Sequence, residues 1–488
     1  MSAIAIAGPS WSTQDTGTFA GRFPLAVERH TLRTVDHPLP GITTVTPHAR
    51  YYTLHALVAL DARERKLDAT AEVDLLRRCE VIMGAISCAH GPHPGWPSPH
   101  GADHIEPQVA EGTVHVKQLT GPEVYAKAIR GFLGPYRSSE WNLGLIALPG
   151  GELAPGDASD AAALRGGLGD IITMATIDDL DVDTLTGNAH LCLCQAGSAP
   201  DGALLRNLLT AADAPDGSTQ EKRRQTLQML GRLLHLHPTN RAQDLWSRIA
   251  YGPLADTDPV LSTLHATSAW QGVVLRTRMV SAWRELWAGL VNSITYFSPI
   301  REVADTFADA LPDLTVSQYR DELPSLVNGQ FLAPAEIDAS VTDRQFGDRQ
   351  LAVLCLVASR AGTLPERAAP YFEGSDDEGQ QLTPTWMKQE LDEWGARPLR
   401  DFALHLVDTL ITRSQRVALS KATIRGGLIK IPTRVHVVDD MIFKDSSEGS
   451  GEVGLRWNQA TSVMAGLGMV QRHDNLWSLT ELGKESLD

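Results

Sequence analysis

Apolar side chains recur three and four positions apart along most of this chain, which is the spacing of one face of an α-helix. The clearest stretches are residues 70–86, 264–294 and 398–422, and Thr70 is the predicted N-cap of the first. Short alternating runs that would predict strands are scattered between them, without the regular strand–helix alternation of a parallel sheet. We therefore expect a mainly α protein, built as several helical domains with short strands.

Two stretches rich in turn-forming residues interrupt this helical pattern. Residues 196–220 hold one short helix between Gly, Ala, Pro and Asp, and residues 361–385 form an acidic loop. With the C-terminal pattern described next, they predict three domains: a mainly helical N-terminal domain over 1–198, a central helical domain over 199–420 and a small domain over 421–488.

The C-terminal segment has the most specific pattern. Residues 455–488 predict a helix that ends near Gly466, a two-stranded hairpin that turns at 473–475, and a final helix capped by Thr480. Helix, hairpin and then “LTELG” resembles the winged-helix family, with residues 414–424 as one of the preceding helices. In that family the helix before the hairpin is usually the recognition helix, and the hairpin is the wing.

The resemblance implies a set of binding residues near the helix start and on the wing. These are Arg456, Asn458, Gln459, Arg472 and His473. Such side chains can contact base edges and phosphates. The segment from 421 onward carries eight basic and nine acidic residues, however, so it lacks the basic face of a DNA-binding domain. Docking on a protein, or a structural role, is therefore favoured, with DNA contact as the alternative.

A histidine-rich loop is the main candidate for metal chemistry. Residues 88–106 contain Cys88, four histidines and two acidic side chains. The histidines are His90, His93, His100 and His104, and Asp103 or Glu106 would be a further ligand or a base. Prolines hold this loop extended, and only one closely spaced ligand pair exists, so we expect a structural loop with no metal and no cofactor. The alternative is a metal-dependent hydrolase or nuclease that uses these histidines.

Other motifs fail on their spacing. The Gly-rich 165–170 lacks the Lys of a P-loop, and 178–190 lacks the Gly and Glu of a calcium loop. Cys192 and Cys194 stand in an apolar run, which predicts a buried element rather than a cross-link.

Five cysteines, no signal peptide and no apolar run of membrane-spanning length predict a cytoplasmic protein with no membrane contact. A net charge of −16 argues against non-specific nucleic-acid binding.

The front of the chain carries a second resemblance. “LPGITTVTPHARYYTLHALVAL”, residues 39–60, is similar to the opening of certain uncharacterised bacterial proteins associated with defence or mobile-element loci. Together with the missing catalytic motifs, it predicts a non-enzymatic subunit or adaptor of a bacterial multi-protein assembly for genome defence. The expected partners are other protein subunits, docked through the C-terminal winged helix, with double-stranded DNA as a further candidate.

Overall fold

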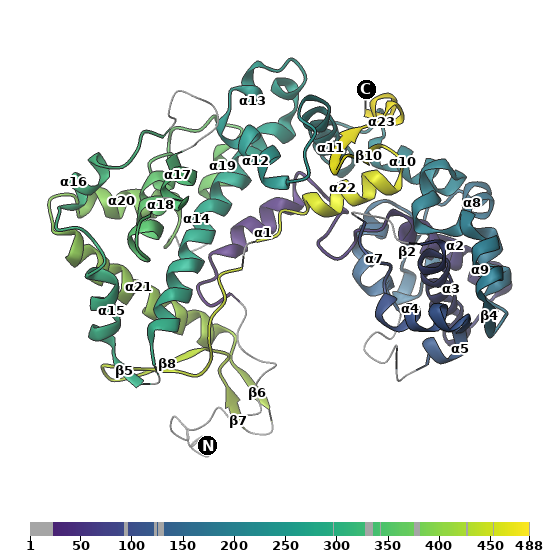
Figure 1. Ribbon diagram of the computed structural model, residues 1–488, viewed down its shortest axis with the longest axis horizontal. Helices are drawn as coiled ribbons and strands as arrows, with labels where there is room; N and C mark the ends of the chain where they lie inside the picture. The colour runs from purple at the N-terminus through teal and green to yellow at the C-terminus, as the bar shows by residue number, and fades with distance from the viewer. Residues whose placement is uncertain are drawn as a thin grey trace. The chain divides into compact units, whose positions relative to one another are not determined.

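A computed structural model (Figure 1) gives the fold and describes most of the chain. It describes residues 23–91, 96–121, 124, 131–295, 297–326, 335–341, 343–374, 381–425, 428–451 and 453–487. The predicted mainly helical architecture is confirmed. None of the described helices is both long and apolar enough to cross a bilayer.

The chain folds into two compact units, each assembled from separate segments. The first unit takes the residues up to Thr34, Ser247–Ala255 and Ser268–Val453. The second unit takes Val35–Trp246, Asp256–Thr267 and Gly454–Asp488. This division does not follow the three consecutive segments expected from the sequence, because the last residues of the chain return to helices that lie more than 200 residues earlier.

The second unit is built around a buried helix, α2 (Ala49–Arg65). Helices α3 (Ala69–His90), α8 (Ala161–Met174) and α10 (Pro200–Thr210) pack against it. From Ala49 to Ala62 every α2 residue is buried, including the polar or charged Arg50, His55 and Asp61. The N-cap of α3 is Asp68, whose carboxylate accepts the N–H groups of Thr70 and Ala71, so the prediction of Thr70 as the cap was wrong.

Shorter elements complete this part of the second unit. They are α4 (Ala102–Glu111), α5 (Val116–Leu119), α7 (Leu133–Asn142), α9 (Val182–Gly187), the 3₁₀ turns η2 (Pro149–Gly151), η3 (Ala189–Leu191) and η4 (Leu193–Ser198), and the strands β1 (Thr113–His115), β2 (Ile146–Ala147), β3 (Ala154–Pro155) and β4 (Asp179–Asp181). Strand β1 pairs with β4, and β2 with β3, both antiparallel.

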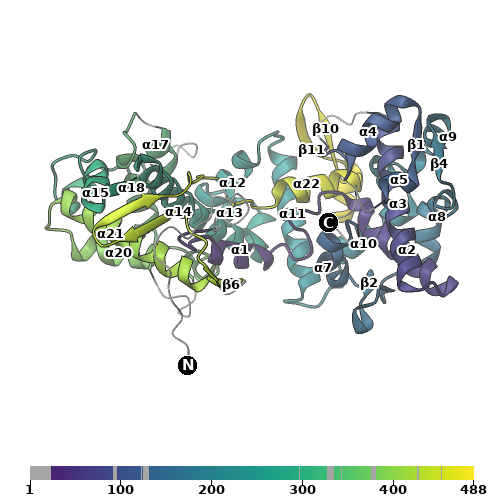
Figure 2. The same cartoon turned by 90° about the horizontal axis from the view of Figure 1, so that it is seen from below.

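The C-terminal segment belongs to this second unit and has the predicted elements. They are α22 (Trp457–Gly466), β10 (Val470–His473), β11 (Leu476–Leu479) and α23 (Glu481–Leu487). The Thr480 hydroxyl accepts the Gly483 N–H at 2.9 Å, as expected of the cap of the final helix. Figure 2 shows the hairpin of β10 and β11 projecting from the helices of its unit. Helix α11 (Thr219–Leu236) packs against β11, and α22 packs against β10.

The first unit surrounds the long helix α14 (His265–Ser293) and the helix α21 (Leu399–Ser420). Residues 414–420, expected to precede the recognition helix, lie in α21 of this first unit, so that expectation was wrong. The other helices wholly within this unit are α15 (Ile300–Ala308), α16 (Val316–Asp321), α17 (Ala335–Val341), α18 (Asp348–Ala358), α19 (Ala369–Glu373) and α20 (Pro384–Glu393). Helices α1 (Glu28–Asp36), α12 (Ala242–Tyr251), α13 (Leu254–Thr257) and α14 each run across a unit boundary. The 3₁₀ turn η5 (Leu261–Thr263) belongs to the second unit.

Strands form a small part of the first unit. Strand β9 (Met441–Lys444) is the centre of a three-stranded antiparallel sheet, with β5 (Phe297–Pro299) on one side and β8 (Val435–Val438) on the other. Strands β6 (Thr423–Arg425) and β7 (Leu428–Lys430) form a separate pair. The core of this unit includes the fully buried Trp270 and Trp283 of α14.

Candidate metal centre

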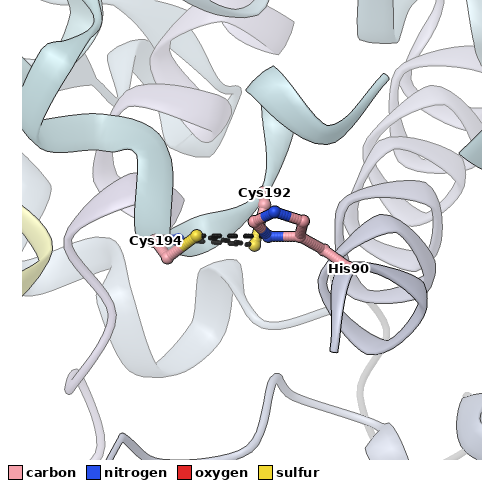
Figure 3. Close-up of side chains that lie close together, drawn as sticks. All are labelled: His90, Cys192 and Cys194. Atoms are coloured by element: carbon pink, nitrogen blue, oxygen red, sulfur yellow. Dashed lines mark hydrogen bonds between the residues drawn. The ribbon is translucent and has the colours of Figure 1, made fainter. Parts of the chain in front are cut away.

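Three side chains of metal-ligand type meet in the second unit, although two of them lie about a hundred residues from the third (Figure 3). His90 is the last residue of α3, and Cys192 and Cys194 flank Leu193 where η3 gives way to η4. The Cys194 Sγ lies 3.3 Å from the Cys192 Sγ and 3.4 Å from the His90 Nδ1. Figure 3 shows His90 projecting from the end of its helix toward the two sulfur atoms.

These distances match the edges of a zinc coordination shell. Ligand atoms about 2.0–2.3 Å from a tetrahedral zinc ion lie about 3.3–3.8 Å from one another. The three ligand atoms are all within 4.8 Å of each other, with Cys192 buried, Cys194 half-buried and His90 exposed. Two thiolates and an imidazole are the ligands that zinc prefers, and three protein ligands leave a fourth position for water or another group.

A buried arginine holds the Cys-x-Cys turn in place. The Arg50 Nη1 donates to the backbone oxygens of His190 at 2.6 Å and Cys192 at 2.7 Å. Its Nε and Nη2 donate to the Asp201 carboxylate, both at 3.2 Å, and neither side chain is exposed. The Leu193 N–H donates to the Ser87 hydroxyl of α3 at 3.1 Å. The turn that carries both cysteines is therefore fixed to α2 and α3 without help from a metal.

The two thiols do not titrate alike. The Cys194 S–H donates to the Cys192 Sγ, and this bond, with the Cys194 N–H, outweighs burial and lowers the pKa of Cys192 to about 4. The same bond, together with burial, raises the pKa of Cys194. Burial raises the pKa of Cys88 to about 12, helped by the charges of Glu106 and Cys192. Metal binding would release the protons that the two thiols still carry.

The histidines singled out in the sequence separate in the structure. His90 joins the two cysteines, whereas His93 lies outside the described residues. His100 packs on Phe132 with ring centroids 4.5 Å apart, and its Nε2 lies 3.3 Å from the Tyr136 hydroxyl. His104 is exposed, with its Nε2 3.5 Å from the carboxylate of its neighbour Asp103. Among the described residues, the ligand set around His90 is completed by cysteines and not by these histidines.

Another histidine of the second unit, His55, lies in a buried network with two acidic side chains. The His55 Nε2 lies 2.9 Å from a Glu80 oxygen, and its Nδ1 lies 2.6 Å from a Glu140 oxygen. None of these three side chains is exposed. Burial alone would lower the pKa of His55, but the two carboxylates outweigh it and raise the pKa to about 10. This cation joins α2, α3 and α7, which indicates a structural role.

The net pKa shift is opposite for His48 and His100, because no carboxylate offsets their burial. Burial lowers the pKa of His48 to about 4, although the Ser98 carbonyl oxygen, 3.0 Å from its Nε2, favours the charged form. It lowers the pKa of His100 to about 3, with the positive charges of His48 and His55 adding to the shift. Both rings are therefore neutral in the folded protein at pH 7.

The residues predicted to contact DNA or a partner fall into two groups. Near the start of α22, Arg456 pairs with Asp36 and donates to the Ile42 oxygen at 3.2 Å, and the Gln459 amide donates to the Thr44 oxygen at 3.2 Å. Asn458 is exposed. On the hairpin, Arg472 and His473 are both exposed, and His473 lies 3.0 Å from the Asp474 carboxylate.

Comparisons with protein-family models, with curated proteins and with solved structures find no match for this chain. The winged-helix resemblance and the resemblance at residues 39–60 therefore stay predictions. The metal-type cluster was missed in the sequence, where Cys192 and Cys194 were assigned to a buried element because their neighbours are apolar. Their Cys-x-Cys spacing was the one local signal available.

Proposed function

We propose that this chain is a docking subunit of a protein assembly, and that its docking module is a winged helix built from two distant segments. The first segment, residues 219–246, supplies α11 and the start of α12. The second, residues 456–487, supplies α22, the hairpin and α23. On this proposal, α11 and α12 are the helices that precede the recognition-type helix, and residues 268–453 of the first unit are inserted in the chain between the module's second and third helices.

The observation that carries the proposal is a backbone pairing between the two segments. Thr239, in the connection between α11 and α12, forms an isolated antiparallel bridge with Trp477 of β11. The Trp477 N–H donates to the Thr239 oxygen at 2.9 Å, and the Thr239 hydroxyl donates to Asp244 at 2.8 Å. The first segment is therefore joined to the two-stranded hairpin by one backbone bridge at Trp477.

Side-chain packing supports the same module. The rings of Trp246 and Trp457 lie with their centroids 3.4 Å apart, which joins α12 to α22. On α11, Gly231 leaves room for two leucines, because a Cβ there would lie 2.5 Å from Leu487 and 3.3 Å from Leu479. The hairpin and α23 thus pack on one face of α11, as a single small core requires.

The surroundings of α22 favour a protein partner over DNA. Most of this helix is buried, and it contacts α2 and η4 of its own unit. Arg456 and Gln459 are already bonded to residues 36–44, so a groove of DNA could reach them only by displacing those contacts. The hairpin remains as the accessible element, since 471–476 are exposed. Its exposed residues include Leu476, 39% exposed and paired with His473, and Arg472, paired with Trp477. This gives the hairpin the mixed apolar and charged character of a protein interface.

The test is affinity purification from the native host at low salt, with and without nuclease, read by quantitative mass spectrometry. A double variant, Arg472→Glu with Leu476→Asp, changes only exposed hairpin side chains. Lys222→Glu, an exposed charge reversal on α11, is the matched control. We expect a stoichiometric protein partner that survives nuclease, is lost with the double variant and is kept with the control. Recovery of the partner with all three proteins, or its loss on nuclease treatment, would contradict protein docking through the hairpin.

We also infer that the second unit binds a zinc ion through His90, Cys192 and Cys194, because their ligand atoms all lie within 4.8 Å of one another and are of the types that zinc prefers. Zinc would link the end of α3 to the Cys-x-Cys turn. The test is elemental analysis of the purified protein and of two variants. Cys194→Ser should lose the metal, whereas His104→Gln should keep about one equivalent. Loss of zinc in His104→Gln would instead support the histidine-loop site, and metal-free wild-type protein after zinc loading and desalting would refute both.

A further inference from the structure

A groove on the docking module lies between the start of α12, α22 and strand β11. It has a volume of about 110 Å³ and is lined by buried and half-buried apolar side chains together with exposed amides. The apolar side chains are those of Leu234, Leu245, Trp457 and Trp477, and the amides are those of Asn240 and Asn458. Sites for cofactors and small ligands usually measure about 300–1,000 Å³, whereas a cavity of about 150 Å³ is enough to admit a benzene ring. The groove therefore has room for one large apolar side chain and not for a cofactor.

Two exposed arginines lie beside the apolar lining of this groove. Arg241, whose side chain is 68% exposed, is the one charged residue among the described residues that line it. Its Nε lies 3.9 Å from an Asp244 carboxylate oxygen, which is longer than a hydrogen bond. Arg472 of β10 is paired with Trp477, and its guanidinium carbon lies 5.9 Å from the centre of the Trp477 ring. Positive charge therefore borders the apolar part of the groove, which is complementary to an acidic ligand.

Hydrogen bonds within the module fix the backbone on one side of the groove. The Trp477 N–H donates to the Thr239 oxygen at 2.9 Å, which joins β11 to the connection before α12. The Arg241 N–H donates to the Thr239 hydroxyl at 3.1 Å, and that hydroxyl donates to the Asp244 carboxylate at 2.8 Å. The backbone that carries Asn240 and Arg241 is therefore held in place, so a ligand has little backbone to order when it binds.

We propose that this groove binds an acidic segment of the protein partner, with one large apolar side chain of that segment as its anchor. The inference rests on the proposed docking function and names the chemistry of the partner. Tryptophan and arginine are the residues that most often hold an anchor side chain at a protein interface. Carboxylates next to the anchor would pair with Arg241 and Arg472. The groove and the exposed hairpin share Trp477 of β11, so one partner can contact both.

The experiment is fluorescence anisotropy of labelled probes with the full chain, at about 150 mM salt, where the Debye length is about 8 Å. The first probe is the peptide Asp-Glu-Phe-Glu-Asp with both ends blocked. A second peptide has alanine in place of the phenylalanine, a third has lysine in place of each acidic residue, and the fourth probe is a short DNA duplex.

Two variants change the groove, and a third is the matched control. Arg241→Glu reverses its charge, and Ser462→Trp fills it from α22. Lys222→Glu makes the same charge reversal at an exposed position of α11. This position is twelve residues from Leu234, or about 18 Å along the helix, which is well beyond the Debye length. Circular dichroism and the melting temperature of each variant check that it is folded.

We expect saturable binding of the phenylalanine peptide, and binding of the alanine peptide weaker by about tenfold because the anchor is lost. Arg241→Glu and Ser462→Trp should each weaken the phenylalanine peptide about tenfold or more, and Lys222→Glu less than about twofold. The inference is overturned if no peptide binds saturably, if the lysine peptide binds as tightly, or if the control weakens binding as much as the groove variants. Tighter binding of the DNA duplex, lost in Arg241→Glu, would also overturn it, in favour of a nucleic-acid ligand.

Affinity purification with the same variants separates this inference from the docking proposal. Loss of the native partner with the hairpin double variant, but not with Arg241→Glu or Ser462→Trp, would leave docking through the hairpin intact and refute the groove as its anchor site. Loss of the partner with both groove variants, but not with the hairpin double variant, would refute docking through the hairpin and, with the peptide results, support the groove.

Discussion

Arg50 gives the sharpest test of how the second unit is held together. Its side chain is fully buried and donates five hydrogen bonds, two to Asp201 and three to the backbone oxygens of Gly167, His190 and Cys192. Arg50→Met keeps an unbranched, flexible side chain that fills the place of the Arg50 methylenes, but it removes the guanidinium, its charge and every donor. Asp201 would then keep the Thr53 hydroxyl, 3.0 Å away, but lose the cation that neutralises it.

The expected cost follows from that buried carboxylate. Breaking a buried ion pair by removing one partner costs about 3–5 kcal/mol. This is a large part of the stability of a domain, which is about 5–15 kcal/mol. In the double variant Arg50→Met with Asp201→Asn, the stranded charge is also removed, so most of the lost stability should return. Arg165→Ala removes an exposed arginine paired with Glu64 and should cost less than about 1 kcal/mol.

Native-state hydrogen exchange read by mass spectrometry is the suitable assay, because two units need not unfold together. In Arg50→Met, the opening free energy of peptides from α2 and from residues 188–201 should fall by about 3–5 kcal/mol, while peptides from α14 and α21 keep theirs. The reasoning is refuted if Arg50→Met exchanges like Arg165→Ala, or if Asp201→Asn brings no recovery in the double variant.

Three further outcomes follow from the second unit. Burial lowers the folded pKa values of His48 and His100 to about 4 and 3, below the ordinary 6.5. The free energy of unfolding should therefore be highest above about pH 6.5 and should fall as the pH drops toward 4. Urea unfolding at several pH values measures this fall, which should be shallower in His100→Phe. Gly202→Ala should lower the urea midpoint strongly, because its Cβ would lie 1.7 Å from a backbone oxygen, whereas Gly169→Ala in α8 meets only an ordinary contact and should be neutral or stabilising. Chelation of bound zinc should speed hydrogen exchange in residues 188–198 and leave α21 unchanged.

Helices were predictable because their signal is local. The expected 264–294 and 398–422 correspond closely to α14 and α21, and the C-terminal helix, hairpin and helix lie where the pattern placed them. Periodicity also reveals where a helix is buried, but it carries no information about which helix covers it. The end of α3 shows a related limit, since the apolar repeat stops before His90 although the helix continues to that residue.

Contacts between distant segments could not be predicted, because the sequence signals used are local. Nothing near Cys192 or Cys194 in the sequence indicates that His90 lies beside them. Likewise, the sequence of residues 455–488 does not indicate that these residues pack against α11.

The discontinuous second unit also determines the order in which the protein can mature during synthesis. Its helices up to α11 leave the ribosome long before α22, the hairpin and α23, which come after residue 453. At about 5–20 residues per second, translation of the intervening chain takes roughly 10–40 s. During that interval the face of α11 at Gly231 has neither Leu479 nor Leu487 to cover it. Newly made chains therefore pass through a stage in which the first unit can fold but the second unit cannot be completed. During this stage an apolar face of α11 is exposed until the last residues of the protein are made.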